Sequence, residues 1–213
     1  MIITGTIIAW IVGSALVGTG GVVVYKHFTD PPVKKIEVEP GKKIAVLGMQ
    51  ASGKTQFLKT LQNQSYNSYM QTSLTPYDEF SFTLPHNGKT IKIASGKDLG
   101  GDEQFTSQYK KVSDGADAVF FTFDIYKFKN DSDYRLQTRA RLQFIDLELN
   151  KPSCKRAIIG SFGDKFNEEQ REEVKNYVIK DLLSIYPSIV ENFLIRDMRN
   201  RDQVLEIVSK LLV

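Results

Sequence analysis

Short apolar runs with the lengths of buried strands recur along the chain from residue 43 onward. They fall at residues 43–47, 80–84, 90–94, 118–123, 157–159 and 192–195. The second and third runs alternate apolar and polar positions on either side of Pro85-His-Asn-Gly-Lys89, which predicts a β-hairpin. The other runs are largely apolar throughout, as is typical of parallel strands that are buried on both faces.

Stretches with helical pattern or composition lie between these runs. They predict helices over residues 55–61, 134–149, 168–186 and 203–212. The third helix is expected to begin at a cap formed by Asn167, because acidic residues fill its first turn. The alternation of strands and helices predicts an α/β fold of three layers, with a mostly parallel sheet and helices on both of its faces.

Residues 1–25 differ from the rest of the chain because they carry no charged side chain. As a helix rising about 1.5 Å per residue, they would span a hydrocarbon core of about 30 Å. We expect a retained transmembrane helix here, followed by a linker over residues 26–42 in which prolines bar a continuous helix. A buried core segment and a cleaved signal peptide are the alternatives, although no basic residue precedes the apolar run.

Charge and cysteine content suggest where the chain resides. Basic residues follow the apolar segment and none precedes it, so the positive-inside rule places residues 26–213 in the cytosol. A single cysteine, Cys154, agrees with a reducing compartment. The net charge of +3 is too small to indicate nucleic-acid binding. The expected partners are therefore the lipid bilayer and a membrane protein or cytosolic effector.

A phosphate-loop motif, G-x-x-x-x-G-K-T, lies between the first predicted strand and the first predicted helix. Its glycines permit a turn that points backbone N–H groups at phosphate oxygens, next to a helix N-terminus. Lys54 is expected to reach the β- and γ-phosphates, and the Thr55 hydroxyl is expected to hold Mg²⁺. The expected nucleotide-binding residues are Gly48, Met49, Gln50, Ala51, Ser52, Gly53, Lys54 and Thr55. A purely structural glycine turn is the alternative.

A second motif, Asp98-Leu-Gly-Gly101, follows the apolar run at residues 90–94. Together with the phosphate loop, this D-x-G-G segment resembles the Ras-like small GTPase family over residues 43–213, and its Arf-type members in particular. The resemblance implies a Ras-like domain that binds GTP or GDP with Mg²⁺. It also implies that Asp98 holds the metal through water and that the Gly101 N–H contacts the γ-phosphate.

The segment between the first helix and the second strand occupies the place of the family's switch I. The resemblance assigns the Mg²⁺-binding threonine of this switch to Thr75, with Thr72 and Ser73 as alternatives. The segment Gln71-Thr-Ser-Leu-Thr75, taken with the apolar N-terminus, is locally similar to the family of signal-recognition-particle receptor β-subunits. Members of that family are membrane-anchored GTPases of the Arf type.

The segments that would read the base depart from the family pattern. Where the family has N-K-x-D, the chain has Ser161-Phe-Gly-Asp164 and keeps only the aspartate. The resemblance implies that Asp164 accepts hydrogen bonds from guanine and that Phe162 lies against the base. The family's S-A-K motif aligns with Asp197-Met-Arg199, so only the backbone N–H of Met198 is left to contact the guanine oxygen. We therefore expect a guanine preference with weakened affinity or specificity.

The hydrolytic position departs from the family as well. Most Ras- and Arf-like members carry a water-orienting glutamine directly after D-x-x-G, where this chain has Asp102. Asp102 and Gln104 are the candidate catalytic residues, and we expect GTP hydrolysis that is slow or assisted by a partner. The chain is thus expected to be a membrane-anchored guanine-nucleotide switch. The alternatives are a catalytically degenerate scaffold of the same fold, which recruits a partner to the membrane, and an ATP-using enzyme such as a small kinase.

Overall fold

The computed structural model describes residues 41–65, 74–148, 154–183, 185–186 and 193–213, which belong to one compact unit. The expected transmembrane helix at residues 1–25 lies outside the described residues, as do most of the linker and both Thr72 and Ser73. Among the helices that are described, none has the length and apolar character needed to cross a bilayer.

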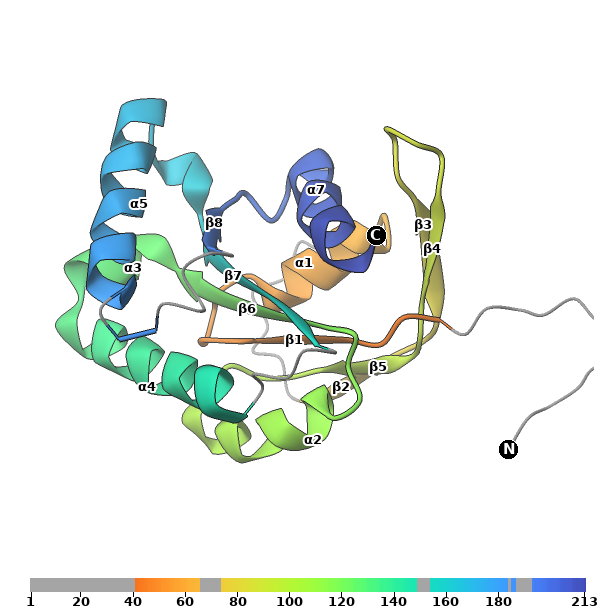
Figure 1. Ribbon diagram of the computed structural model, residues 1–213, viewed down its shortest axis with the longest axis horizontal. Helices are drawn as coiled ribbons and strands as arrows, with labels where there is room; N and C mark the ends of the chain where they lie inside the picture. The colour runs from red at the N-terminus through yellow and green to blue at the C-terminus, as the bar shows by residue number, and fades with distance from the viewer. Residues whose placement is uncertain (1–40, 66–73, 149–153, 184, 187–192) are drawn as a thin grey trace, which may run out of the picture. The chain divides into compact units, whose positions relative to one another are not determined.

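A parallel sheet forms the middle layer of this unit (Figure 1). Its strands are β1 (Ile44–Gly48), β6 (Ala118–Asp124), β7 (Lys155–Ser161) and β8 (Phe193–Ile195), paired in that order. All pairings in this sheet are parallel, so the carboxyl ends of the strands share one edge. The predicted parallel sheet is confirmed, and this edge is where ligands bind in such folds.

Two antiparallel pairs precede β6 along the chain. β3 (Phe80–Thr83) and β4 (Thr90–Ile93) form the predicted hairpin. β2 (Thr75–Tyr77) pairs with β5 (Gly96–Asp98), and this pair was not predicted because each strand has only 3 residues and contains a proline or a glycine. Lys42, which the sequence places in the linker, is hydrogen-bonded to β4, so the folded unit begins before residue 43.

Helices cover both faces of the sheet (Figure 1). They are α1 (Lys54–Leu61), α2 (Tyr109–Ser113), α3 (Ile125–Asn130), α4 (Ser132–Glu148), α5 (Glu168–Leu183) and α7 (Arg201–Leu212), with 3₁₀ helices at Glu103–Gln108 and Gly163–Lys165. The predicted helices correspond to α1, α4, α5 and α7, whereas α2 and α3 are too short to show a helical period. Asn167 caps α5 as expected, because its side chain accepts from the Gln170 N–H at 2.8 Å and the Gln170 side chain accepts from the Asn167 N–H at 3.1 Å.

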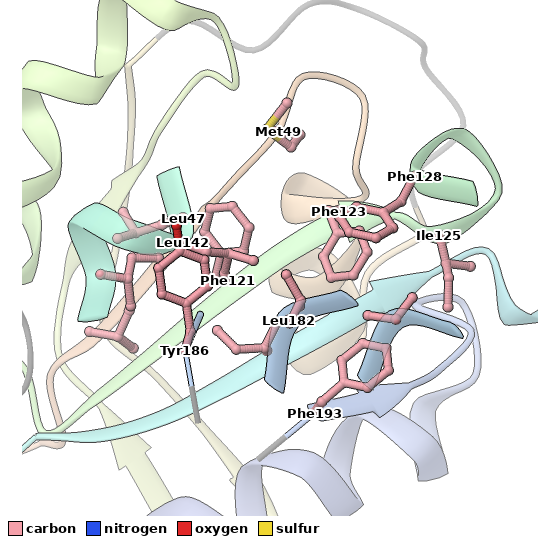
Figure 2. Packing of buried hydrophobic residues seen from close by; sticks show 14 of the residues in the cluster. Leu47, Met49, Phe121, Phe123, Ile125, Phe128, Leu142, Leu182, Tyr186 and Phe193 are labelled. Carbon is pink, nitrogen blue, oxygen red and sulfur yellow. The ribbon is translucent and has the colours of Figure 1, made fainter. Parts of the chain in front are cut away.

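Strand residues alternate between two apolar cores, one on each face of the parallel sheet. In β1, Ile44 and Val46 belong to the core beneath α1 and α7, whereas Ala45 and Leu47 belong to the core shared with α4 and α5. Figure 2 shows the core shared with α4 and α5, in which the ring of Phe123 lies beside residues from α3. Burial on both faces explains why β1 and β6 are largely apolar, and it makes the sheet a rigid support for the loops at its carboxyl edge.

Candidate nucleotide-binding site

The loop between β1 and α1 has the backbone that a phosphate cradle requires. Gly48 and Gly53 adopt φ values of 144° and 87°, and Ala51 adopts a φ of 54°, which are conformations that side chains rarely permit. A Cβ atom on Gly48 would lie 2.1 Å from the Thr122 carbonyl oxygen, so only glycine fits beside β6. The chain therefore reverses sharply at the end of β1 and wraps around the N-terminus of α1, where anions are favoured.

Lys54, the first residue of α1, is buried and reaches back across this loop. Its Nζ donates to the Met49 carbonyl at 2.7 Å and to the Gly48 carbonyl at 3.4 Å. Burial lowers the pKa of Lys54 to about 8, against an opposing contribution from the Asp98 carboxylate. A buried ammonium held by neutral carbonyls gains strongly from an anionic ligand, because the ligand offsets its lost hydration.

Thr55 and Asp98 meet beside Lys54, at the start of α1. The Thr55 hydroxyl donates to Asp98 Oδ2 at 2.6 Å, while the buried Oδ1 atom has no hydrogen-bond partner among the described residues. Burial raises the pKa of Asp98, and the hydrogen bond from Thr55 opposes that rise. Thr75 lies opposite Asp98 in the β2–β5 ladder. The three residues that the sequence nominates as metal ligands are thus brought together.

An orphaned carboxylate oxygen beside a threonine hydroxyl fits the oxygen ligands that Mg²⁺ prefers. Within the described ranges, no cluster of three or more His, Cys, Asp and Glu side chains is arranged to hold a metal. An ion at Asp98 would therefore complete its shell with water and with the oxygens of a nucleotide, as Mg²⁺ does at phosphate-transfer sites.

Arg141 is a buried cation of this site that the sequence analysis did not single out. It projects from α4, and its Nη1 donates to the Gly101 carbonyl at 2.6 Å, to the Gly48 carbonyl at 3.3 Å and to the Tyr109 hydroxyl at 3.4 Å. These partners are neutral oxygens, so the charge of Arg141 has no carboxylate partner among the described residues. Its position on the buried face of α4, next to Leu142, was the available signal, because a charged residue there interrupts an apolar stripe.

The D-x-G-G segment packs directly against the phosphate loop. A Cβ atom on Gly101 would lie 2.4 Å from the backbone nitrogen of Gln50, so the two backbone segments are too close for any side chain at position 101. Asp102 follows at the wall of the cavity, whereas Gln104 is exposed and does not line it. Of the two candidate catalytic residues, the structure therefore brings only Asp102 to the phosphate loop.

Phe162 and Asp164 follow β7 and line the same cavity as the phosphate loop. Phe162 has a φ of 62°, a strained value for an aromatic residue, and the Lys165 ammonium lies 4.6 Å from its ring centroid. Asp164 Oδ2 accepts from Arg199 Nη2 at 2.6 Å. The carboxylate that would select guanine is thus already paired with a cation.

Met198 connects the loop after β8 to the phosphate loop. Its carbonyl accepts from the Thr60 hydroxyl at 2.7 Å, and its buried side chain lies 3.2 Å from the position that a Cβ on Gly53 would occupy. The flanking residues Asp197 and Arg199 are bonded to each other, with Arg199 Nε donating to Asp197 Oδ1 at 3.1 Å. Burial raises the pKa of Asp197, but the hydrogen bonds from Arg199 outweigh that effect and lower it overall.

One cavity of about 1200 Å³ is lined by the phosphate loop and by the loops after β7 and β8, and it is large enough for a nucleotide. The expected site residues along its wall are Met49, Gln50, Ala51, Ser52, Gly53, Lys54, Thr55, Gly101, Asp102, Phe162, Asp164 and Met198. Gly48, Thr75 and Asp98 are not part of the wall, although Gly48 and Asp98 are bonded to residues that are. Lining residues that the sequence analysis did not nominate include Lys127, Tyr134, Gln137, Arg141, Lys165, Asp197 and Arg199.

A phosphate loop at the carboxyl edge of a parallel sheet, with a Thr–Asp pair beside its lysine, defines a P-loop nucleotide-binding protein. The sequence model of the Ras protein family matches residues 43–180, and the chain belongs to this family of small GTPases. Proteins of this family generally bind GTP and GDP with Mg²⁺. No curated protein matches the chain.

Proposed function

We propose that the chain is a membrane-anchored guanine-nucleotide switch. The observation that carries the proposal is one cavity with nucleotide dimensions, which is lined by the phosphate loop, by Thr55, whose hydroxyl donates to Asp98, and by Asp164. Membership of the Ras family supports a switch of the small GTPase type. The guanine preference, the metal and the anchor are the finer parts of the proposal.

The part of the cavity that is lined by the phosphate loop, called here the phosphate end, would act mainly by electrostatics. Lys54 gains a phosphate in place of two carbonyls, and Thr55 with Asp98 would hold Mg²⁺, with Thr75 beside them from the switch I side. The bound Mg²⁺ would supply charge neutralisation at the phosphates. Because Gly101 packs on the loop at Gln50, a γ-phosphate there would change the position of the segment that follows, which is how such a switch signals.

The part of the cavity that is lined by Phe162, Asp164 and Met198 is called here the base end. There, Asp164 would accept hydrogen bonds from the N–H groups of guanine. The Phe162 ring would cover one face of the base, and the Met198 N–H would donate to the guanine oxygen. These assignments agree with the presence of all three residues in the cavity wall. The expected guanine preference is weaker than in most of the family, because Ser161 and Phe162 stand where the family has asparagine and lysine.

Hydrolysis is proposed to be slow or to depend on a partner. Asp102 stands where the family has a water-orienting glutamine, and a carboxylate repels the anionic phosphate that it would face. The same feature supports the second candidate function, a catalytically degenerate scaffold that recruits a partner to the membrane. Steady nucleotide binding without turnover would favour the scaffold, whereas turnover that rises with a partner favours the switch.

The remaining finer points concern location and subfamily. The uncharged segment at residues 1–25 and the basic residues after it support a single-pass anchor with the nucleotide-binding unit in the cytosol. The D-x-G-G form of the second motif supports an Arf-type relationship. The segment Gln71-Thr-Ser-Leu-Thr75 supports similarity to signal-recognition-particle receptor β-subunits. A membrane protein or cytosolic effector is the proposed partner.

Isothermal titration of the detergent-solubilised full chain with GTP, GDP and ATP, in Mg²⁺ and again in EDTA, tests the proposal. We expect binding of both guanine nucleotides, weaker binding of ATP, and a loss of affinity in EDTA that is larger for GTP than for GDP. Tight ATP binding that GTP does not compete with would overturn the guanine assignment. Equal affinities with and without Mg²⁺ would overturn the metal site at Thr55 and Asp98.

A further inference from the structure

Two aspartates from different loops meet at the base end of the cavity, with one arginine between them. Asp164 follows β7 and Asp197 follows β8. Arg199 Nη2 donates to Asp164 Oδ2 at 2.6 Å and to Asp197 Oδ2 at 3.2 Å, so a single nitrogen holds both carboxylates. Asp197 Oδ1 also accepts from the backbone N–H of Arg199 at 2.9 Å, which ties the arginine to its own loop.

The burial of the three side chains shows what the arginine offsets. Asp164 and Asp197 expose 34% and 22% of their side chains, whereas Arg199 exposes 63%. Both carboxylates are therefore partly removed from water, and they would repel each other if the guanidinium left. The nearby Lys165 ammonium does not replace it, because that group lies over the ring of Phe162.

The pairing still leaves Asp164 able to bind a base. A carboxylate has about four lone-pair sites, and Arg199 occupies one of those on Oδ2. Among the described residues, no other donor is bonded to Asp164. The remaining sites match the two adjacent N–H donors of guanine, whereas adenine presents an acceptor at the corresponding ring nitrogen. Arg199 is thus placed to support guanine binding by Asp164 and not to block it.

We propose that Arg199 is a positioning residue for base recognition, which separates Asp164 from Asp197 and orients the Asp164 carboxylate toward the guanine edge. This inference rests on the proposed guanine-nucleotide function and adds a specificity-determining arginine to it. It also explains how the chain tolerates an aspartate at position 197, since Arg199 neutralises the second carboxylate that Asp197 introduces.

The first test is titration of the full chain in detergent with GDP and with ADP, comparing the unaltered protein with Arg199→Ala. We expect the variant to bind GDP about tenfold more weakly, because a charge-assisted hydrogen bond that orients the acceptor is lost. ADP affinity should stay unchanged, so the GDP-to-ADP affinity ratio falls by the same factor. Arg199→Lys should lie between the two, because lysine keeps the charge but lacks the planar fork.

A double variant separates positioning from a purely structural role. In Asp197→Ser/Arg199→Ala the second carboxylate is absent, so GDP affinity should return to within about threefold of the unaltered protein, which makes the two sites energetically coupled. Arg196→Ala is the matched control, because it removes a cation and an ion pair with Glu206 from the same loop without touching the cavity wall. Its GDP affinity should not change.

Three results would overturn the inference. Tighter GDP binding by Arg199→Ala would show that the arginine competes with the base. Equal losses of GDP and ADP affinity, or a double variant no better than Arg199→Ala, would show that the arginine only stabilises the loop. A chain that binds neither nucleotide before any substitution would instead overturn the proposed function on which this inference rests, so the two failures are distinguishable.

Discussion

The two ends of the cavity are formed by different kinds of chemical groups. At the phosphate end, backbone groups and buried charges make the site: Gly101 packs on the loop at Gln50, and Lys54 and Arg141 share the Gly48 carbonyl. At the base end, the carboxylate assigned to the base belongs to a partly exposed side chain, Asp164, whose described hydrogen bond comes from another side chain, that of Arg199. The phosphate end is therefore set by the fold, whereas side-chain pairs on loops set the base end.

This difference predicts how the two ends respond to substitution. A change at the phosphate end alters buried backbone packing, so it affects the fold as well as the ligand. A change at the base end mostly exchanges one exposed pair for another and leaves the fold in place. The phosphate end should therefore respond to substitution with large losses for every nucleotide, and the base end with smaller losses that depend on the base.

The largest expected effect comes from Lys54→Met. Removal of the buried ammonium should weaken GDP and ADP alike by at least about a hundredfold, because each loses a charge-assisted contact in a desolvated site. The melting temperature without nucleotide should hold or rise, since a buried cation that is hydrogen-bonded only to neutral carbonyls is replaced by an apolar chain of similar length. Calorimetric titration measures the nucleotide affinities, and thermal unfolding measures the melting temperature. Lys59→Met, on the same helix but outside the cavity, should bind normally, and a GDP-selective loss would contradict the prediction.

Asp164→Asn should give the next largest effect and confine it to guanine. GDP affinity should fall by about fiftyfold, because an amide donor replaces an acceptor opposite the N–H groups of the base. ADP affinity should be unaffected, and competition binding with both nucleotides measures the ratio. If ADP binding fell as far as GDP binding, the distinction between the two ends would be wrong.

Arg141→Met tests whether the buried arginine acts on the terminal phosphate. We expect GTP affinity to fall about tenfold and GDP affinity less, because Arg141 holds Gly101, on the side where a third phosphate would lie. Titration with GTP and GDP in Mg²⁺ measures the difference. Arg139→Met serves as the control on the same helix, since Arg139 pairs with Asp181 and lies outside the cavity wall. Equal losses for both nucleotides would show that Arg141 is only structural.

The smallest expected effect is that of Phe162→Gly. Glycine relieves a left-handed backbone strain of about 1 kcal/mol, so the unfolding free energy without nucleotide should be unchanged or slightly higher. Nucleotide affinity should fall about threefold for GDP and ADP alike, because a ring face for the base is lost. Chemical denaturation and titration measure the two quantities, and a clear loss of stability without nucleotide would contradict the explanation by strain.

The elements that the sequence predicted are those in which one physical signal dominates. β1 and β6 are apolar because both of their faces are buried, and α5 begins at a capping pair that can be recognised from Asn167. The phosphate loop was recognisable because its glycines must adopt positive φ values. The β2–β5 pair was missed because its stability comes from a partner strand and not from its own pattern.

By itself, the chain predicted the parallel sheet and the phosphate loop, because local pattern carries that information, and its resemblance to a family nominated Asp98, Asp164 and Met198 as candidate site residues. Only the tertiary structure showed that Arg141 reaches the loop from α4 and that Arg199 bridges Asp164 to Asp197. Those contacts join residues far apart in sequence, and their geometry depends on how helices and loops pack at the carboxyl edge of the sheet. Motif spacing nominates the groups that are expected to meet a ligand, but packing decides which charges balance them.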